Sequence, residues 1–275
     1  FVFTAAASLP WTVSAYFAAR RVPVLEGWGL AEPSPCCTLT DLNAARSVPG
    51  MVGYPIPGVT IRLAPDGEIL VRGSNVMPGY FLNPEATAEA LPGDGWFHTG
   101  DLGEFVGAGL KLVARKDRVF KMLNAEKVVP TEIENRLVAM NSYIRHVIVA
   151  GAGRGFLAAL IFPDYLRIAE QFGADRATAE SVVKASLRDT VLAFNAEHRV
   201  KYERIQAFAV ISKELSLDDE ELTPSMKVRV RNVLANAEEY IEAVYEPSED
   251  CDCRFLRKVM RLSPDDRRCR AGLDR

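Results

Sequence analysis

Four short segments of this 275-residue chain combine residue types that could do chemistry. The first runs from Glu26 to Glu32 and contains Gly27-Trp28-Gly29. Glycines on both sides of an aromatic ring let the backbone approach a planar ligand closely, and the Glu32 carboxylate could hold a divalent cation. A strand that simply ends in glycines explains the same residues, so this segment alone leaves both interpretations open.

The second segment surrounds Asp101 in the run Trp96-Phe97-His98-Thr99-Gly100-Asp101-Leu102-Gly103. An aspartate held between glycines offers two acceptor oxygens, which suit a pair of vicinal hydroxyls such as those of ribose. The alternative is a turn in which the Asp101 side chain caps the backbone.

The third and fourth segments are charged. The third is Arg115-Lys116-Asp117-Arg118, with Lys121, Glu126 and Lys127 close behind, and the fourth is Leu222 to Arg229, which contains Lys227. A run of charges is usually a solvated face, and a lysine after a turn is usually a surface residue. Neither segment decides a function by itself.

The elements that must position these segments follow two patterns. In the first part, apolar runs predict a strand over 1–3, a helix over 11–19 and a strand over 22–25. Alternation on both sides of Pro65-Asp66-Gly67 predicts a hairpin within 55–73. From Pro130 on, helices and strands alternate, and Thr131 with Glu134 predicts a capping box.

The expected elements of the second part follow from apolar periodicity. They are a helix with a stripe at Ile133, Leu137 and Met140, strands over 143–150, 157–162 and 205–211, amphipathic helices over 165–172 and 183–194, and a closing helix over 230–241. The acidic run 218–221 predicts a solvated loop, and residues 246–275 predict a poorly ordered, mildly cationic tail. Membrane-surface contact through this tail stays open as an alternative.

Composition narrows the class of protein. A net charge of −3 and a pI near 5.8 argue against a nucleic-acid-binding chain. Five cysteines are too few for a disulfide scaffold and favour free thiols in the cytoplasm, and Cys251, Cys253 and Cys269 give only a weak zinc pattern. Residues 1–19 carry no charge, but Pro10 and several hydroxyl residues interrupt the run, so we expect the chain to begin inside a buried region.

Together, and in this order, the four segments resemble one family, the adenylate-forming or AMP-binding enzymes, which include acyl-CoA synthetases, luciferases and peptide-synthetase adenylation domains. The resemblance covers residues 1 to about 245 and is to the C-terminal half of such enzymes. It implies a mixed α/β fold: part of a large N-terminal lobe over 1–114 with a β-rich subdomain from about 50, a hinge at 115–118, and a small α/β C-terminal domain over 119–245.

The resemblance also implies roles for single residues. Trp28 matches the adenine-stacking aromatic and is followed by Gly29, while Asp101 matches the aspartate that binds the ribose hydroxyls, with Arg115 beside it. Glu32 matches the glutamate near the Mg²⁺ that accompanies ATP.

Three further segments gain roles in the same way. Asp117 falls at the hinge about which the C-terminal domain rotates, and Lys227 matches the lysine that bridges the carboxylate and the α-phosphate during adenylation. Residues 5–10 resemble the loop that lines the adenine and acyl pocket.

The fourth segment and the helical insert at about 164–200 are similar to those of long-chain fatty acyl-CoA ligases. This subfamily implies activation of a fatty acid by ATP and transfer of the acyl group to CoA. The loop Asn124-Ala125-Glu126-Lys127 resembles that of reductase-linked adenylation domains, which load a carrier protein instead.

The sequence also departs from the family pattern. Ala31 and Ala125 replace a threonine and a glycine, and Arg118 replaces an acidic residue. The chain contains no Gly/Ser/Thr-rich phosphate loop that ends in a lysine and lacks the N-terminal acyl-pocket region, so we expect these 275 residues alone to be inactive. A non-catalytic nucleotide-binding relic is therefore a further alternative.

Overall fold

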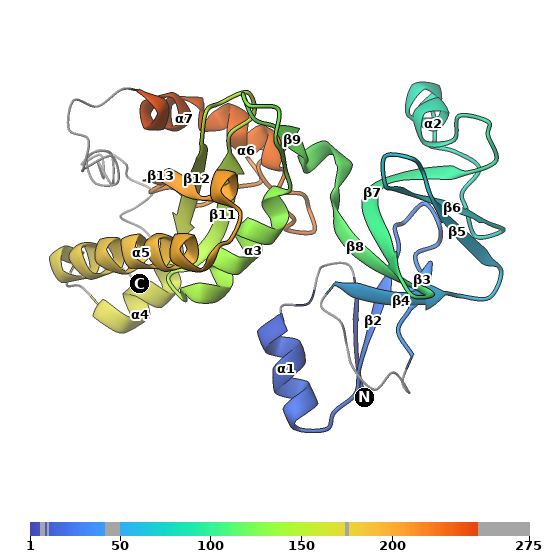
Figure 1. Ribbon diagram of the computed structural model, residues 1–275, viewed down its shortest axis with the longest axis horizontal. Coiled ribbons are helices and arrows are strands. Elements are labelled where there is room, and N and C mark those ends of the chain that lie inside the picture. Colours follow the sequence, from blue (N-terminus) through green and yellow to red (C-terminus); the bar gives the residue numbers. More distant parts are fainter. Residues whose placement is uncertain (6–8, 10, 42–49, 174–175, 247–275) are drawn as a thin grey trace. The chain divides into compact units, whose positions relative to one another are not determined.

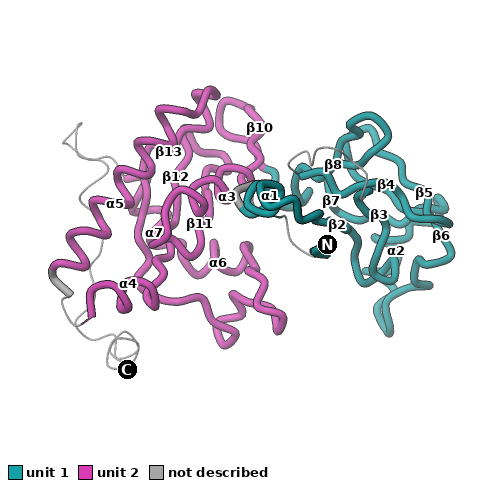
Figure 2. Tube along the Cα trace, turned by 90° about the horizontal axis from the view of Figure 1, so that it is seen from below, with its two compact units in different colours: residues 1–119 teal, residues 120–275 magenta. Residues whose placement is uncertain are grey.

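A boundary at residue 119 divides the chain: residues 1–119 form one unit and residues 120–275 form another (Figure 2). The computed structural model describes residues 1–5, 9, 11–41, 50–173 and 176–246 (Figure 1). Both units combine helices with a sheet, so the expected mixed α/β class is confirmed. The predicted hinge at 115–118 lies next to this boundary, and rotation about Asp117 stays a prediction.

The first unit is built on an eight-stranded sheet in the order β1-β2-β3-β4-β8-β7-β6-β5. β1 and β2 pair in parallel, and the other neighbours pair antiparallel. The strands are β1 (Val2–Ala5), β2 (Val24–Trp28), β3 (Thr38–Leu39), β4 (Met51–Pro55), β5 (Val59–Leu63), β6 (Glu68–Gly73), β7 (Phe97–Val106) and β8 (Gly109–Arg115). The helices are α1 (Trp11–Ala19), α2 (Pro84–Ala90) and the 3₁₀ turn η1 (Lys116–Arg118).

The local predictions for the first unit are confirmed where short-range patterns decide the structure. Helix α1 spans the predicted residues, and β5 and β6 form the predicted hairpin, in which Gly67 N donates to the Ala64 carbonyl at 2.9 Å. The segment around Asp101 is different. It lies in strand β7, so the alternative of a turn capped by Asp101 is wrong. In the β7–β8 ladder Asp101 stands directly opposite Arg115.

The second unit contains a three-stranded sheet in the order β11-β12-β13 and a small β9–β10 hairpin. β11 and β12 are antiparallel, as the two apolar runs around Gly151 to Gly155 predict, and β12 and β13 are parallel. The strands are β9 (Phe120–Lys121), β10 (Lys127–Val128), β11 (Ile144–Ala150), β12 (Leu157–Pro163) and β13 (Ile205–Val210). The helices are α3 (Pro130–Met140), α4 (Tyr165–Phe172), α5 (Arg176–Glu197), η2 (Lys201–Glu203), α6 (Val230–Asn236) and α7 (Glu238–Tyr245).

Each face of this sheet carries its own core. Side chains of a strand alternate between the two faces, so Val147 and Val149 pack with α3, α4 and α5, whereas Ile148 packs with α6 and α7. Figure 1 shows these two groups of helices around the β11–β13 sheet. The second unit is thus a helix–sheet–helix layer structure with a buried sheet.

Two predictions for helix ends in the second unit are wrong. Helix α3 begins at Pro130 with Val129 as its N-cap and no side-chain cap, so Thr131 and Glu134 form no capping box. The Glu134 carboxylate instead accepts a hydrogen bond of 2.8 Å from Val149 N on β11, because tertiary packing offers it a better donor. The closing helix is two helices, α6 and α7, which meet at Ala237.

The prediction of a solvated loop over 218–221 is also wrong at its last residue. Glu221 is fully buried and pairs with Lys213. A run of like charges carries no information on a partner that lies elsewhere in the chain, so the pattern could not show this exception.

Ala125, the residue that stands where the family has a glycine, adopts the left-handed backbone conformation with φ +63°. A Cβ in this region clashes with the backbone, at a cost of about 1–2 kcal/mol. We expect Ala125→Gly to raise the free energy of unfolding by about 0.5–1 kcal/mol, because part of the gain is offset by the greater freedom of glycine in the unfolded chain.

Urea unfolding of the chain measures this change. Ala235→Gly is the matched control, because it makes the same change of side chain at an exposed position of helix α6. Glycine has a lower helix propensity than alanine, so this variant should destabilise the chain by about 0.5–1 kcal/mol. If both variants destabilised the chain, the backbone at Ala125 would not be strained.

Candidate functional site

A cluster around Asp101 joins three of the residues predicted to bind a nucleotide. Trp28 Nε1 donates a hydrogen bond of 2.8 Å to Asp101 Oδ2, and Arg115 donates one of 2.9 Å to Oδ1. Each carboxylate oxygen has two lone pairs, so each still has one acceptor position. The arrangement fixes the carboxylate plane and leaves one lone pair on each oxygen without a donor among the described residues, on a side chain that is 13% exposed.

Strand pairing and a glycine set the position of Asp101. Gly100 has φ +68°, a region that glycine adopts without strain, and its missing side chain leaves room for the Arg115 guanidinium. Asp101 N donates to Thr99 Oγ1 at 3.0 Å, and the buried Thr99 hydroxyl donates to the Ile69 carbonyl at 2.7 Å. The site is therefore anchored to strand β6 as well as to β8.

Glu68 on β6 completes this anchor, and the sequence analysis missed it. Its buried carboxylate accepts hydrogen bonds from Gly100 N at 2.9 Å and from Lys116 Nζ at 2.8 Å. Burial alone would raise the pKa of Glu68, but the Lys116 ammonium and the Gly100 N–H outweigh it and hold the pKa below its ordinary value. Glu68 thus stays ionised and links the backbone beside Asp101 to the residue that precedes Asp117.

Arg115 remains charged in this cluster. Burial would lower its pKa, but the Asp101 and Asp117 carboxylates raise it. Asp117, the predicted hinge residue, is 74% exposed in η1, and its Oδ1 lies 3.6 Å from Arg115 Nε. The contact is a surface ion pair, which contributes little to stability.

Trp28 and Gly29 are packed tightly at the end of strand β2. Trp28 is 6% exposed and belongs to the core of the first unit, so only part of its ring can face a ligand. A Cβ at Gly29 would lie 1.9 Å from the Pro35 carbonyl oxygen, which explains the glycine by backbone packing. Contact of either residue with a nucleotide stays a prediction.

Glu32, the predicted magnesium ligand, accepts a hydrogen bond of 2.8 Å from the Tyr80 hydroxyl. Burial, reinforced by the Glu32 carboxylate, raises the pKa of Tyr80 to about 12, while Arg115 acts on it in the opposite sense. Glu32 keeps a second oxygen for a hard cation, so the residue fits a Mg²⁺ that is held by one carboxylate and by phosphate oxygens.

Lys227, in the second unit, lies on a tight turn. Leu222 and Val228 form an antiparallel bridge; Thr223 N donates to the Lys227 carbonyl at 2.8 Å, and Lys227 N donates to Thr223 Oγ1 at 3.0 Å. The side chain is exposed, and its ammonium makes no hydrogen bond or ion pair within the part of the chain that the structure describes. The backbone of Lys227 is therefore fixed while its charge is available.

The predicted residues thus fall into three groups. Trp28 and Arg115 both contact Asp101, and Asp117 pairs with Arg115 at the edge; Glu32 is hydrogen-bonded to Tyr80; and Lys227 lies on a turn of the other unit. Most of the predicted pocket loop, at residues 6–8 and 10, lies outside the described residues, as do the tail and its three cysteines.

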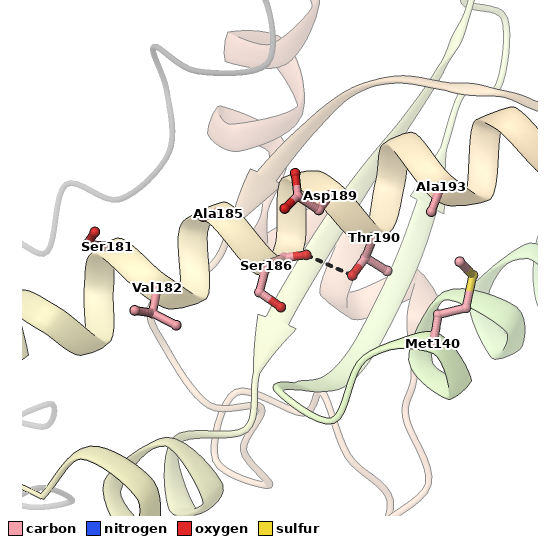
Figure 3. A pocket seen from close by; sticks show the side chains of 8 residues that line it. All are labelled: Met140, Ser181, Val182, Ala185, Ser186, Asp189, Thr190 and Ala193. Atoms are coloured by element: carbon pink, nitrogen blue, oxygen red, sulfur yellow. Dashed lines mark hydrogen bonds between the residues drawn. The ribbon is translucent and has the colours of Figure 1, made fainter.

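Other surfaces add little chemistry. A hollow of about 590 Å³ between α3 and α5 is lined by Met140 and by residues of α5, mostly small (Figure 3), and contains none of the predicted site residues.

Within the described ranges, no group of three or more His, Cys, Asp or Glu side chains could hold a metal ion. No helix among these residues is long and apolar enough to cross a membrane.

Two family matches cover most of the chain. The AMP-binding enzyme family matches residues 1–81, and the C-terminal domain of AMP-binding enzymes matches residues 117–249. The chain therefore belongs to the AMP-binding, adenylate-forming enzymes.

Its curated relatives include long-chain-fatty-acid–CoA ligases. The chain is 32% identical over 268 residues to long-chain-fatty-acid–CoA ligase 6 of Homo sapiens, an alignment that covers 90% of this chain and 38% of that enzyme. It is 33% identical over 239 residues to long-chain-fatty-acid–CoA ligase FadD15 of Mycobacterium tuberculosis, with 84% and 39% covered. The chain thus spans about two fifths of the length of the relatives it matches.

Solved structures share the fold. The adenylation domain of the carboxylic acid reductase from Segniliparus rugosus, in complex with AMP and a carboxylic acid, matches with a TM-score of 0.68 and 22% identity over 89% of this chain and 39% of that one. O-succinylbenzoate–CoA synthetase from Bacillus subtilis, in complex with ATP and magnesium ion, matches with a TM-score of 0.63 and 21% identity over 85% and 46%.

Proposed function

We propose that this chain is part of a ligase that activates a fatty acid with ATP and transfers the acyl group to CoA. The observation that carries the proposal is the Trp28–Asp101–Arg115 cluster, which holds a carboxylate with two open acceptor positions in a chain of the AMP-binding family. Similarity to long-chain-fatty-acid–CoA ligases supports the substrate class.

In the first step of the proposed reaction, a carboxylate oxygen of the fatty acid attacks the α-phosphorus of ATP. The bond from this phosphorus to the β-phosphate bridging oxygen breaks, and pyrophosphate leaves. Asp101 would hold the ribose, and the Lys227 ammonium would stabilise the negative charge that develops around the α-phosphorus. Bound at Glu32, Mg²⁺ would neutralise phosphate charge.

In the second step, the CoA thiol releases its proton to solvent and the sulfur attacks the acyl carbonyl carbon. The bond from this carbon to the phosphate oxygen breaks, and AMP leaves as the thioester forms. The lysine and the thiol both need access to the reacting group, so the two steps require different arrangements. We propose that the C-terminal unit turns about Asp117 between them and removes Lys227 after adenylation.

A full-length enzyme that contains these 275 residues tests the proposal. We expect pyrophosphate exchange into ATP that depends on a long-chain fatty acid, followed by consumption of CoA. The 275 residues alone should form no acyl-CoA, because they contain no phosphate loop. Exchange followed by transfer only to a phosphopantetheinyl carrier protein would favour the carrier-loading alternative. Nucleotide binding without exchange for any carboxylic acid would favour a relic.

A further inference from the structure

A fully buried carboxylate lies at the base of the turn that carries Lys227. Glu221 has no exposed surface, and its Oε1 accepts hydrogen bonds from Lys213 Nζ at 2.6 Å and from Asn236 Nδ2 at 3.2 Å. Burial alone would lower the pKa of Lys213, but the Glu221 carboxylate raises it, so the ammonium stays charged. Glu221 is therefore held by an ion pair with Lys213 and by a hydrogen bond from Asn236 at the end of helix α6.

The backbone of Glu221 also closes this turn. Arg229 N donates to the Glu221 carbonyl at 2.7 Å, and Glu221 N donates to the Ser216 carbonyl at 3.0 Å. Between these bonds lie the Leu222–Val228 bridge and the two hydrogen bonds that join Thr223 to Lys227. A shift at Glu221 would therefore be transmitted directly to Lys227.

Asparagines on one face of α6 hold the same loop. Asn232 Nδ2 donates to the Glu220 carbonyl at 2.8 Å, and Asn236 Nδ2 also donates to the Asp219 carbonyl at 3.1 Å. The two asparagines are four positions apart in the helix, so their side chains leave it on the same side. Helix α6 thus holds residues 219–221 of the loop through its two asparagines, and Glu221 adds the ion pair with Lys213.

The ion pair between the fully buried Glu221 and the 37% exposed Lys213 is a poor source of stability, because the cost of removing a carboxylate from water can exceed the attraction. Its geometry, in contrast, is well defined. We propose that Glu221 and Lys213 are positioning residues that fix the turn 222–228 and thereby set the place from which Lys227 acts. The inference rests on the proposed function for the role of Lys227, whereas the fixing of the turn can be measured without activity.

Glu221→Gln tests the inference, because it keeps the size of the side chain and removes its charge. Amide hydrogen exchange should become about 10-fold faster over 221–229, where the N–H groups of Thr223, Lys227 and Arg229 are hydrogen-bonded, and should not change in strands β11 and β12. In the full-length enzyme, fatty-acid-dependent pyrophosphate exchange should fall about 10-fold, since small displacements of a catalytic group cost this much or more. Thioester formation from a synthetic acyl-adenylate should stay within about twofold, because Lys227 does not serve that step.

Two further variants separate position from charge. Lys213→Met should have effects at least as large as those of Glu221→Gln, because it leaves the buried Glu221 carboxylate without its cation. Lys213→Arg should largely preserve both readouts, because it retains a cation. Glu197→Gln is the matched control, since Glu197 forms an exposed ion pair with Arg136 in the same unit, and it should change neither readout.

Unchanged amide exchange over 221–229 in Glu221→Gln would overturn the inference, and so would equal losses in the two half-reactions. Faster amide exchange with unaltered pyrophosphate exchange would overturn it as well. If the unmodified enzyme lacked pyrophosphate exchange with every acid, the proposed function would fail, and the amide-exchange result would still decide whether the pair fixes the turn.

Discussion

Replacement of Lys227 by alanine should slow acyl-adenylate formation by about 10²-fold or more, the cost of losing one preorganised donor to developing negative charge. The Lys227 backbone is held on both sides by Thr223, while its ammonium has no ion-pair partner among the described residues. Lys227 therefore combines the two properties that a residue stabilising the developing negative charge needs, a fixed backbone and an available ammonium.

The measurement is a pair of assays on the full-length enzyme. Pyrophosphate exchange reports the first step, and thioester formation from synthetic acyl-adenylate reports the second, which should change far less. Lys201→Ala is the control, because Lys201 is another exposed lysine of the same unit and should affect neither step. Equal losses in both steps would make Lys227 structural, and an unchanged exchange rate would remove it from the reaction.

The sequence could propose residues for the candidate site, Glu68 excepted, but not the contacts among them. Residue order and type identified Asp101 and Arg115, because the family motifs are local. That the two side chains face each other across β7 and β8 depends on the register of a long hairpin with a bulge at Leu102 and Gly103. No short-range pattern encodes that register.

Buried charges were the least accessible to sequence reasoning. Glu68 accepts a hydrogen bond from the N–H of Gly100, which lies 32 residues further along the chain. Glu221 belongs to an acidic run that resembles a solvated loop. In both cases a lysine outside the segment supplies the charge that makes burial possible: Lys116 lies 48 residues from Glu68, and Lys213 lies eight residues from Glu221. Apolar periodicity, in contrast, predicted most helices and strands of the second unit, because a buried sheet and its covering helices impose it directly.

Asp101→Ala should weaken AMP binding by about 100-fold, because two hydrogen bonds to a charged acceptor are lost and together contribute about 3 kcal/mol. The variant also removes the acceptor of Trp28 Nε1, so its melting temperature must be measured in parallel. Glu104→Gln is the matched control. Glu104 lies on the same strand in an exposed ion pair with Lys111, and the change should leave AMP binding unaltered.

A comparison of AMP with 2′-deoxy-AMP separates a ribose contact from general damage to the site. The unmodified enzyme should bind the deoxynucleotide about 10-fold more weakly, because one hydrogen bond to the Asp101 carboxylate is missing. In Asp101→Ala the two nucleotides should bind with equal affinity, since the carboxylate that distinguishes them is gone. The comparison is a double-mutant cycle in which one of the two changes is made in the ligand. If the variant still preferred AMP, Asp101 would not contact the ribose, and the Trp28–Asp101–Arg115 cluster would only hold strands β2, β7 and β8 together.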